Sequence, residues 1–273
     1  MLAFIPYYPT PMVELPFPGD EPMVLDSWAV LVAVAFVVGM EMARARGLKL
    51  GLDVRDIVDG SVFIVAMGFL VGHLVHVLAY HPEIYERDGV MSLVRFWEGF
   101  SSMGGFLGAV LGSVLFFVGL RKRPYWLHAD TIAWGLPFGW VFGRLGCFTA
   151  HDHIGRATDF FLAVNFPTMG PRHDLGLYEA LWSAGIASVF WALRRRATRP
   201  GFYLALFAML YAPARFGLDF LRSVDLESSD LRYSGLTPAQ WLCVVMFVGG
   251  ALVVLRLRAQ APTAAAPAQP PDR

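Results

Sequence analysis

The chain has few cysteines and few charged side chains. Two of its 273 residues are cysteine, Cys147 and Cys243, so a framework of several disulfides is excluded. Charged residues make up 16% of the chain, and 22 Lys and Arg against 22 Asp and Glu give a formal net charge of +0. A nucleic-acid-binding protein needs a basic surface to neutralise phosphates, so this balance argues against nucleic acid as a partner.

Long apolar segments occupy most of the chain instead. Hydrophobic residues make up 56% of it and its mean hydropathy is +0.51, which indicates a multispanning membrane protein. A helix needs about 20 apolar residues to cross roughly 30 Å of hydrocarbon. About seven segments approach that length, so we expect an all-α membrane protein with about seven transmembrane helices. They are approximately 28–42, 58–80, 102–120, 131–149, 177–193, 202–221 and 238–255, of which the first and fifth are short for a full span.

Basic residues follow every second apolar segment. Cytoplasmic loops of membrane proteins are enriched in Lys and Arg, so these clusters predict the cytoplasmic side. We therefore expect the N-terminus outside, the C-terminus in the cytoplasm, and the connection 150–176 outside. The predicted cytoplasmic residues are Arg44, Arg46, Lys49, Arg55, Arg121, Lys122, Arg123, Arg194, Arg195, Arg196, Arg199, Arg256 and Arg258.

The two ends of the chain differ in composition from the membrane domain, for which we expect residues 28–258. Residues 1–27 are rich in proline, which forbids a regular helix, and they lack the uninterrupted apolar core of a signal peptide. We expect this segment to lie along the outer surface. Residues 259–273 are rich in Ala and Pro and predict a disordered tail. No internal repeat of the inverted-transporter kind is present.

Glycines recur in the third apolar segment. Gly104, Gly108 and Gly112 are four residues apart, and Gly105 follows the first, so they share one face of a helix. Small residues at this spacing are typical of closely packed membrane helices. In a second interpretation, the backbone at Gly104 and Gly105 approaches a lipid headgroup. The sequence leaves both interpretations open.

The fourth apolar segment contains Arg144 and runs directly into a segment rich in Gly, Arg and His. A guanidinium at membrane depth costs roughly 2.5–3.5 kcal/mol on insertion scales, so we expect it to have a function, with an anionic lipid headgroup as its partner. Metal binding and simple salt bridging are alternatives, and Cys147 is by default a small packing residue. We expect no metal site, because adjacent histidines without a second well-spaced pair are a weak signal. The metal alternative uses His151, Asp152, His153 and His173, and the salt-bridge alternative uses Arg156, Asp152 and Asp159.

A third polar cluster lies in the sixth apolar segment, within YAPARFGLDFLR. Tyr211, Arg215, Asp219 and Arg222 recur near every fourth residue and so share one helix face. A polar face in an apolar span turns inward, toward a cavity or toward partner helices. In one interpretation Arg215 and Asp219 only neutralise each other. In the other, which we favour because each arginine has one acid nearby, Arg144 and Arg215 hold a bound anion between them.

The chain resembles the phosphatidylglycerol:prolipoprotein diacylglyceryl transferases of bacterial inner membranes over nearly its whole length. It has a proline-rich outer N-terminus, a W-E-G-x-S-S-x-G-G-x-x-G segment that begins at Trp97, and the GRLG signature. It also has an R-H-x4-Y-E element and an R-F-x-x-D-F-x-R helix. The resemblance implies that Arg144 and Arg215 are the two essential arginines, and that Tyr178 and Glu179 form the Tyr-Glu element.

Such enzymes move the diacylglyceryl group of phosphatidylglycerol onto the lipobox cysteine thiol of a prolipoprotein and release glycerol phosphate. The resemblance implies these two substrates as partners, the bacterial cell inner membrane as location, a periplasmic-facing site, and no metal or organic cofactor. Arginines would bind the phosphodiester and stabilise the leaving phosphate, and a base would generate the thiolate. The expected substrate-binding residues are Arg144, Gly104, Gly105, Tyr178, Glu179, Asp219 and Arg222, and the expected catalytic residues are His151, His153, His173 and Arg215.

The chain departs from the family pattern at this expected site. The histidine of the family's H-G-G motif is Met103 here, which cannot accept a proton, and the signature asparagine is Cys147. One outcome is that one of the three outer histidines takes over the base role, since a neutral imidazole accepts a thiol proton near pH 7. The alternative is a non-catalytic phospholipid-binding paralogue, or a transferase with another acceptor. We favour the first outcome, and a different headgroup transferase or a transporter stays a minor alternative.

Overall fold

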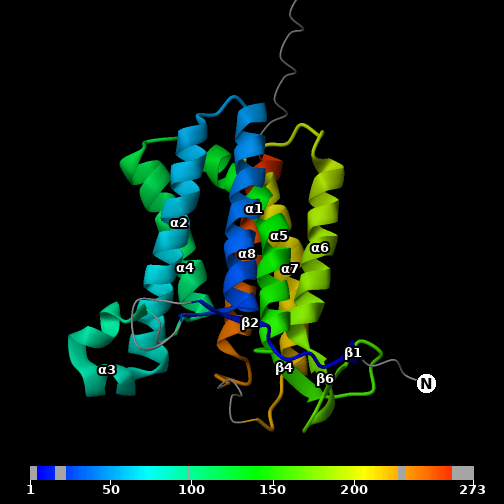
Figure 1. Cartoon of the computed structure of the whole chain (residues 1–273). Helices are drawn as coiled ribbons and strands as arrows, with labels where there is room; N and C mark the ends of the chain where they lie inside the picture. Colours follow the sequence, from blue (N-terminus) through cyan, green and yellow to red (C-terminus); the bar gives the residue numbers. More distant parts are fainter. Residues whose placement is uncertain (1–4, 16–22, 97–98, 227–231, 260–273) are drawn as a thin grey trace, which may run out of the picture.

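The chain folds into a bundle of long helices with a small sheet at one end (Figure 1). The computed structural model describes residues 5–15, 23–96, 99–226 and 232–259. π-Helical turns, His76–Tyr80 and Leu115–Leu120, extend two of the helices, and the short α3 (Pro82–Asp88) follows the first of these turns. The long helices are α1 (Ser27–Lys49), α2 (Val54–Val75), α4 (Ser102–Val114), α5 (Tyr125–Ala150), α6 (Leu175–Leu193), α7 (Phe202–Leu218) and α8 (Pro238–Ala259).

Within the described residues, 5 helices are long and apolar enough to cross a membrane. They are Ser27–Lys49, Val54–Tyr80, Met103–Leu120, Phe202–Leu221 and Pro238–Ala259. The two other long helices, α5 and α6, pack against each other, and both pack against α7. The prediction of a mostly helical protein with several membrane spans is confirmed, and a count of seven spans stays a prediction.

The first and fifth predicted segments begin at capped helix ends, and the first is much longer than predicted. Helix α1 begins where the Asp26 carboxylate accepts a hydrogen bond of 2.7 Å from a first-turn N–H, and it continues to Lys49, well past the predicted end at residue 42. Its basic residues therefore lie in the last turns, where the partial negative charge of the helix C-terminus favours cations. Helix α6 begins at Leu175 and is capped by Asp174 in the same way. The short length predicted for the first segment was therefore wrong, whereas α6 extends the fifth by only two residues and is not among the helices of the described chain that are long and apolar enough to span.

Glycines allow α1 to approach α5 closely. A Cβ atom on Gly135 of α5 would lie 2.1 Å from the carbonyl oxygen of Gly39 in α1. One on Gly139 would lie 2.3 Å from the carbonyl oxygen of Ala35. Contacts this short are far inside van der Waals distance, so a side chain at either position would force the two helices apart.

We expect Gly135→Ala to lower the free energy of unfolding by about 1–3 kcal/mol, because α1 and α5 must separate to admit the methyl group. Gly185→Ala is the matched control, since Gly185 is also within a helix and a Cβ there would meet nothing within 4 Å. The control is expected to be neutral or to raise stability by about 0.5–1 kcal/mol. Unfolding in detergent micelles measures both variants. Equal effects would show that the close approach does not limit stability.

The glycine face of α4 packs against α2. A Cβ on Gly104 would lie 2.8 Å from the Val71 carbonyl oxygen, and one on Gly108 would lie 2.3 Å from that of Met67. A Cβ on Gly112 would contact the Met67 side chain at 2.8 Å. Close helix packing is therefore what these glycines provide in the structure. Approach of a lipid headgroup to Gly104 and Gly105 stays a prediction.

The outer connection, expected as a loop, forms a sheet together with the N-terminal segment. The strands β1 (Ile5–Pro6), β4 (Ile154–Ala157), β5 (Val164–Phe166) and β6 (Gly170–Asp174) are arranged in the order β1-β5-β6-β4. β1 is parallel to β5, and the other two pairs are antiparallel. A separate hairpin pairs β2 (Met12–Leu15) with β3 (Met23–Asp26). The sheet thus joins the N-terminal strand β1 to the segment that follows α5.

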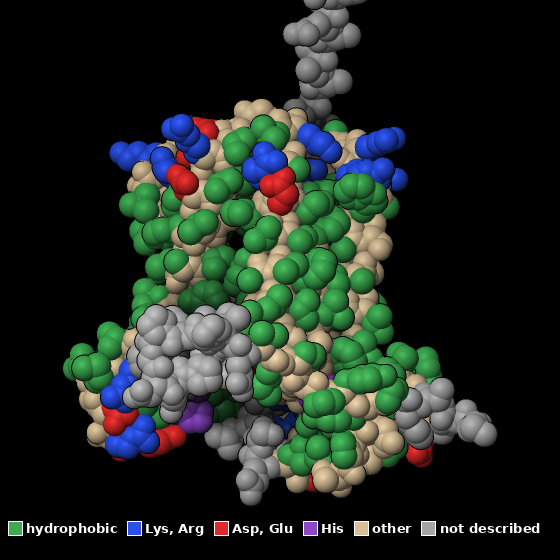
Figure 2. All heavy atoms as spheres, in the orientation of Figure 1, with side chains coloured by type: hydrophobic (Ala, Val, Ile, Leu, Met, Phe, Trp, Pro, Cys, Tyr) green, Lys and Arg blue, Asp and Glu red, His purple; other side chains and the backbone are tan. Residues whose placement is uncertain are grey.

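Lys and Arg side chains gather at the end of the bundle opposite the sheet, beyond a band of hydrophobic side chains (Figure 2). All of the predicted cytoplasmic residues lie in the last turns of α1 and α8, the first turn of α2, or the α4–α5 and α6–α7 connections. These segments share one end of the bundle in Figure 1. Ala259, assigned to the tail by its composition, is instead the last residue of α8, and residues 260–273 lie outside the described chain.

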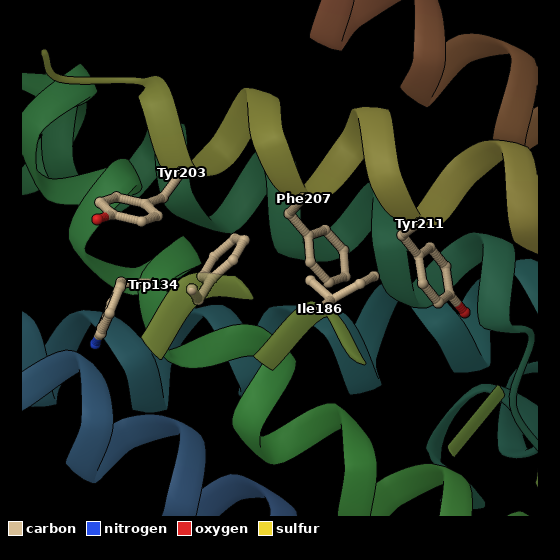
Figure 3. Close-up of a cluster of buried hydrophobic side chains, with 6 residues drawn as sticks. Trp134, Ile186, Tyr203, Phe207 and Tyr211 are labelled. Atoms are coloured by element: carbon tan, nitrogen blue, oxygen red, sulfur yellow. The ribbon is translucent and has the colours of Figure 1, made fainter. Parts of the chain in front are cut away.

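Buried aromatic residues connect the helices that carry the polar clusters. Trp134 of α5 and Tyr203 of α7 pack edge to face, with ring centroids 4.8 Å apart. Tyr203, Phe207 and Tyr211 follow one another on successive turns of α7, and Phe207 stacks on Tyr211 at 5.2 Å (Figure 3). This cluster positions the Tyr211 hydroxyl at a buried polar site.

Candidate active site

Two arginines from different helices converge on one buried carboxylate. Arg144 lies in the last third of α5, Arg215 near the end of α7, and Glu179 in the second turn of α6. These three helices pack against one another, which brings together residues that are far apart in sequence. Both arginines are 8% exposed and Glu179 is 1% exposed.

Glu179 forms an ion pair with each arginine. Its Oε2 lies 3.1 Å from Arg144 Nε, and its Oε1 lies 3.2 Å from Arg215 Nε. The premise that each arginine has only one nearby acid was wrong for Arg215, which pairs with both Glu179 and Asp219, whereas a bound anion between the two arginines stays a prediction. Glu179 supplies a second acid, and the sequence could not reveal it because α6 lies between the two arginine helices only in space.

The ion pairs leave hydrogen-bonding capacity at the centre of the cluster. Arg144 Nε and Glu179 Oε1 are buried and have no hydrogen-bond partner within the described chain, because the N–H directions miss the facing oxygens. Buried polar atoms normally have such partners. The cluster is therefore equipped to bind an additional polar group.

Tyr211 joins the same cluster and was not among the predicted site residues. Arg144 Nη2 donates a hydrogen bond to Tyr211 Oη at 3.1 Å, and Tyr211 Oη donates one to Glu179 Oε2 at 2.7 Å. Tyr211 is 2% exposed. Its position in the sequence could have indicated this role, because it lies one helical turn before Arg215 on the polar face of the same helix.

Asp219 holds Arg215 from the opposite side. Arg215 Nη1 donates to Asp219 Oδ1 at 2.5 Å, and the Thr237 hydroxyl donates to Asp219 Oδ2. Mutual neutralisation of Arg215 and Asp219 is thus present, whereas contact of Asp219 with substrate stays a prediction. Arg222 does not continue the helix face as predicted, because α7 ends at Leu218 and Arg222 follows a 3-10 turn in extended backbone.

A second group of side chains lies beside Arg144. After α5, His151 adopts a left-handed backbone conformation with φ of 51°, which reverses the chain over the helix end. Asp152 and His153 then lie near Cys147, and their ligand atoms and the Cys147 sulfur all lie within 4.8 Å of one another. Cys147 Sγ is 3.9 Å from Arg144 Nη1, and Asp152 forms a short hydrogen bond with His153 Nδ1. Within the described chain these three residues are the group that could hold a metal ion.

This grouping differs from both alternatives raised by the sequence. His151 and His173 pair elsewhere, so the four-residue metal set does not form. The proposed salt bridges of Arg156 with Asp152 and Asp159 were also wrong. Asp152 bonds to His153, and Arg156 Nε donates to the carbonyl oxygen of Arg222 at 3.3 Å.

His151 connects the helix end to the N-terminal segment. Its Nδ1 lies 2.8 Å from Asp174 Oδ2, and its Nε2 lies 3.1 Å from the carbonyl oxygen of Tyr8. Two acceptors require both ring nitrogens to carry hydrogen, which is the charged form. Burial opposes that charge, but the hydrogen bond to Asp174 and its negative charge outweigh burial and raise the pKa of His151 above 6.5. Its nitrogens are thus committed to structure, although its predicted catalytic role is not tested.

The stability of the docked N-terminal segment should therefore depend on pH. Because the folded pKa of His151 is raised, its contribution is complete below pH 6.5 and is lost as the pH rises through the folded value. We expect faster hydrogen exchange in residues 5–8 at pH 8.5 than at pH 5.5, after correction for intrinsic rates. His151→Asn should flatten this dependence, since asparagine tolerates the left-handed backbone without titrating. An unchanged pH profile in this variant would contradict the assignment.

His173 and Tyr178 form a separate pair. His173 Nδ1 lies 2.9 Å from Tyr178 Oη, which also lies 3.4 Å from the carbonyl oxygen of Leu162. Burial lowers the pKa of His173, which keeps its ring neutral near pH 7. The third candidate, His153, lies beside Cys147, whose sulfur is 3.9 Å from Arg144 Nη1. The structure thus brings His153 to the arginine cluster.

The family motif on α4 is only partly described. Met103 occupies the first turn of this helix and is half-buried, and Ser101 caps the helix by accepting from the Gly104 N–H at 3.3 Å. Trp97 and Glu98 of the same motif lie outside the described residues.

Comparison with known proteins gives one consistent result. The family model for prolipoprotein diacylglyceryl transferase matches residues 20–256. A phosphatidylglycerol–prolipoprotein diacylglyceryl transferase of Erythrobacter litoralis is 33% identical over 243 residues, covering 82% of this chain and 83% of the relative. The enzyme of the same name from Pasteurella multocida is 33% identical over 255 residues, covering 88% and 93% respectively. With its apolar helices, the chain is a multi-pass membrane protein and belongs to the prolipoprotein diacylglyceryl transferase family of enzymes.

Proposed function

We propose that this chain transfers the diacylglyceryl group of phosphatidylglycerol to the lipobox cysteine thiol of a prolipoprotein and releases glycerol phosphate. The proposal is supported by family membership and by the names of the relatives, which state both substrates. In the reaction, the acceptor sulfur forms a bond to the glyceryl carbon, and the carbon–oxygen bond to phosphate breaks. The electron pair stays on the phosphate oxygen, where negative charge develops.

The observation that carries the proposal is the meeting of Arg144 and Arg215 at a buried, incompletely hydrogen-bonded carboxylate. Guanidinium groups bind phosphate oxygens through directed N–H groups, and the absence of bulk water strengthens such contacts. Glu179 and Tyr211 keep the arginines in place before the lipid arrives. The lipid phosphate would then supply the acceptor that Arg144 Nε lacks, which stabilises the departing glycerol phosphate.

The position of this site within the bundle suggests its side of the membrane. Arg144 is near the sheet end of α5, whereas the basic clusters lie at the opposite end. If that basic end is cytoplasmic, the site faces the periplasm of a bacterial inner membrane, with the N-terminus outside and the C-terminus inside. Both substrates are then available on the same side. Modification of single cysteines introduced near Tyr8 and Lys122 with a membrane-impermeant thiol reagent tests this orientation, in a background without Cys147 and Cys243.

His153, paired with Asp152, is the histidine best located to act on the acceptor thiol, because it neighbours Cys147, which lies beside Arg144. Tyr178, Gly104, Gly105, Asp219 and Arg222 retain their proposed substrate-binding roles. His151, His173 and Arg215 retain their proposed catalytic roles, His151 and His173 with weaker support because their hydrogen bonds point elsewhere.

The reaction itself tests the proposal. We expect the purified protein in detergent, supplied with phosphatidylglycerol and a lipobox peptide, to release glycerol phosphate and lipidated peptide in equal amounts. A peptide with serine in place of the cysteine is the control and should release none. Binding of phosphatidylglycerol without release of glycerol phosphate would instead favour the non-catalytic paralogue. Release with the serine peptide would indicate another acceptor.

A further inference from the structure

Two buried polar groups without hydrogen-bond partners lie one helical turn away from the arginine cluster. Trp140 precedes Arg144 by four residues in α5, and Ser183 follows Glu179 by four residues in α6. The Trp140 Nε1 and Ser183 Oγ atoms are buried and have no hydrogen-bond partner in the part of the chain that the structure describes. Buried polar atoms are normally paired, so these two groups require an explanation.

Comparable side chains elsewhere in the helices have partners. The hydroxyls of Ser61 and Ser188 each donate to the carbonyl oxygen four residues earlier, at 2.7 and 2.8 Å. The indole N–H groups of Trp182 and Trp241 donate to the carbonyl oxygens of Leu210 and Tyr233, at 3.0 and 3.1 Å. The two unpartnered groups beside the arginine cluster therefore differ from the usual behaviour of serine and tryptophan in this chain.

Both groups belong to the surroundings of the arginine cluster. Arg144 Cζ lies 5.2 Å from the centroid of the Trp140 ring, and Tyr211 packs edge to face against the same ring at 5.8 Å. Ser183 is 0% exposed. It shares the helix face of Glu179, because residues four apart lie on the same side of an α-helix. A ligand bound at the arginines is therefore close to both groups.

The two groups also lie at similar depth. Helix α5 runs toward the sheet end of the bundle and α6 runs away from it (Figure 1), so Trp140 and Ser183 are both farther from the sheet than the cluster is. Four residues of an α-helix rise by about 6 Å. In phosphatidylglycerol the glycerol unit separates the phosphate from the ester carbonyls by a similar distance, on the side of the acyl chains. A phosphate at Arg144 would bring these carbonyls to the depth of Trp140 and Ser183.

We propose that the Trp140 Nε1–H and the Ser183 hydroxyl donate hydrogen bonds to the ester carbonyl oxygens of the diacylglyceryl group. This inference rests on the proposed function and adds a second part of the lipid that the chain recognises. Ester carbonyl oxygens are good acceptors, whereas the ether oxygens of a dialkyl lipid are weak ones. The two donors thus select diacyl lipids over dialkyl lipids and hold the reacting glyceryl carbon at a fixed place relative to the arginines.

Two lipids that differ only in these carbonyl groups test the proposal. Dioleoyl phosphatidylglycerol and its dioleyl ether analogue share the headgroup, the reacting glyceryl carbon and the chain length. We expect the wild-type protein to bind the ester lipid about 10-fold more tightly, the effect of roughly one net hydrogen bond. Native mass spectrometry of the protein in detergent measures the binding of each lipid. Equal affinity of the wild type for the two lipids would overturn the proposal.

Variants that remove one donor each assign the effect to these residues. Trp140→Phe keeps an aromatic ring against Tyr211 and removes the N–H, and Ser183→Ala removes the hydroxyl. Each should weaken binding of the ester lipid by about 3–10-fold and leave binding of the ether lipid unchanged. Ser188→Ala and Trp241→Phe are the matched controls and should keep the wild-type preference, because those donors already have partners. Equal losses with both lipids would indicate a structural role only and contradict the proposal.

Binding and turnover together separate this inference from the proposed function. If the protein prefers the ester lipid as described but releases no glycerol phosphate from it, the carbonyl-binding site stands and the proposed transfer fails. If glycerol phosphate is released from both lipids with the same KM and kcat, the proposed function stands and the carbonyl-binding site is refuted. If neither lipid binds, both are refuted.

Discussion

Replacing Glu179 by alanine is expected to lower the free energy of unfolding by about 3–5 kcal/mol, the usual effect of removing one partner from a buried ion pair. The variant would leave Arg144 without its carboxylate and Arg215 with Asp219 alone, and Tyr211 Oη would lose its acceptor. A buried guanidinium without a counter-charge is unfavourable in any environment of low polarity. Chemical or thermal unfolding in a fixed detergent measures the difference.

A surface ion pair provides the control for this prediction. Glu41 pairs with Arg44 in the exposed part of α1, where the two side chains are 54% and 37% exposed. Glu41→Ala should therefore change stability by about 1 kcal/mol or less. Glu179→Gln should fall between the two, since it retains the shape and the acceptor for Tyr211 while removing the charge. A loss in Glu179→Ala no larger than in the control would mean that the arginines find other partners.

Replacing Arg144 by alanine is expected to reduce transfer by about 10²–10³-fold, the range for removal of one donor aimed at a developing negative charge. The fold should be affected less than by loss of Glu179, because Glu179 keeps Arg215 as its partner. Arg144→Lys should recover little activity. A lysine ammonium lacks the planar guanidinium whose separate N–H groups can donate to Tyr211 and to a phosphate at the same time. Initial rates of glycerol phosphate release at saturating lipid are the measurement.

The control for Arg144 is an arginine at the opposite end of the bundle. Arg55 is exposed in the first turn of α2, and Arg55→Ala should transfer at the wild-type rate. A decrease of less than tenfold in Arg144→Ala, with the lipid saturating, would remove Arg144 from the proposed mechanism. A decrease that disappears at high lipid concentration would restrict its role to lipid binding.

Much of the fold was predictable because local physical rules dominate in long apolar helices. The spans at 102–120, 202–221 and 238–255 were predicted within a few residues, since composition and length alone distinguish them. Errors occurred at polar boundaries. The predicted first segment ended at residue 42 because basic residues follow it. Lys and Arg are nevertheless good helix formers and are favourable at a helix C-terminus, so α1 continues through them. The strands of the outer connection are too short for an alternation pattern, and one of them, β5, pairs with β1 at the other end of the membrane domain's outer segments, where Ile5 is opposite Val164.

The candidate site was predictable in its residues and not in its contacts. The cost of a charge in an apolar helix identified Arg144 and Arg215 from sequence, and spacing identified Asp219 as a partner of Arg215. The roles of the three histidines could not be separated in the same way. His151 bonds to Tyr8 and Asp174, which the sheet brings together from distant parts of the chain, and His173 bonds to Tyr178 of α6.

The amino-acid sequence by itself determined that this chain is a helical membrane protein with its basic residues at one end and two arginines in apolar helices, because hydrophobicity and charge act on each segment independently. Only the tertiary structure decided that Glu179 lies between those arginines, that Tyr211 joins them, and that Cys147 meets Asp152 and His153. These contacts depend on which helix faces touch and on one chain reversal at His151. Such relations are properties of packing and arise only when segments distant in sequence share the same space.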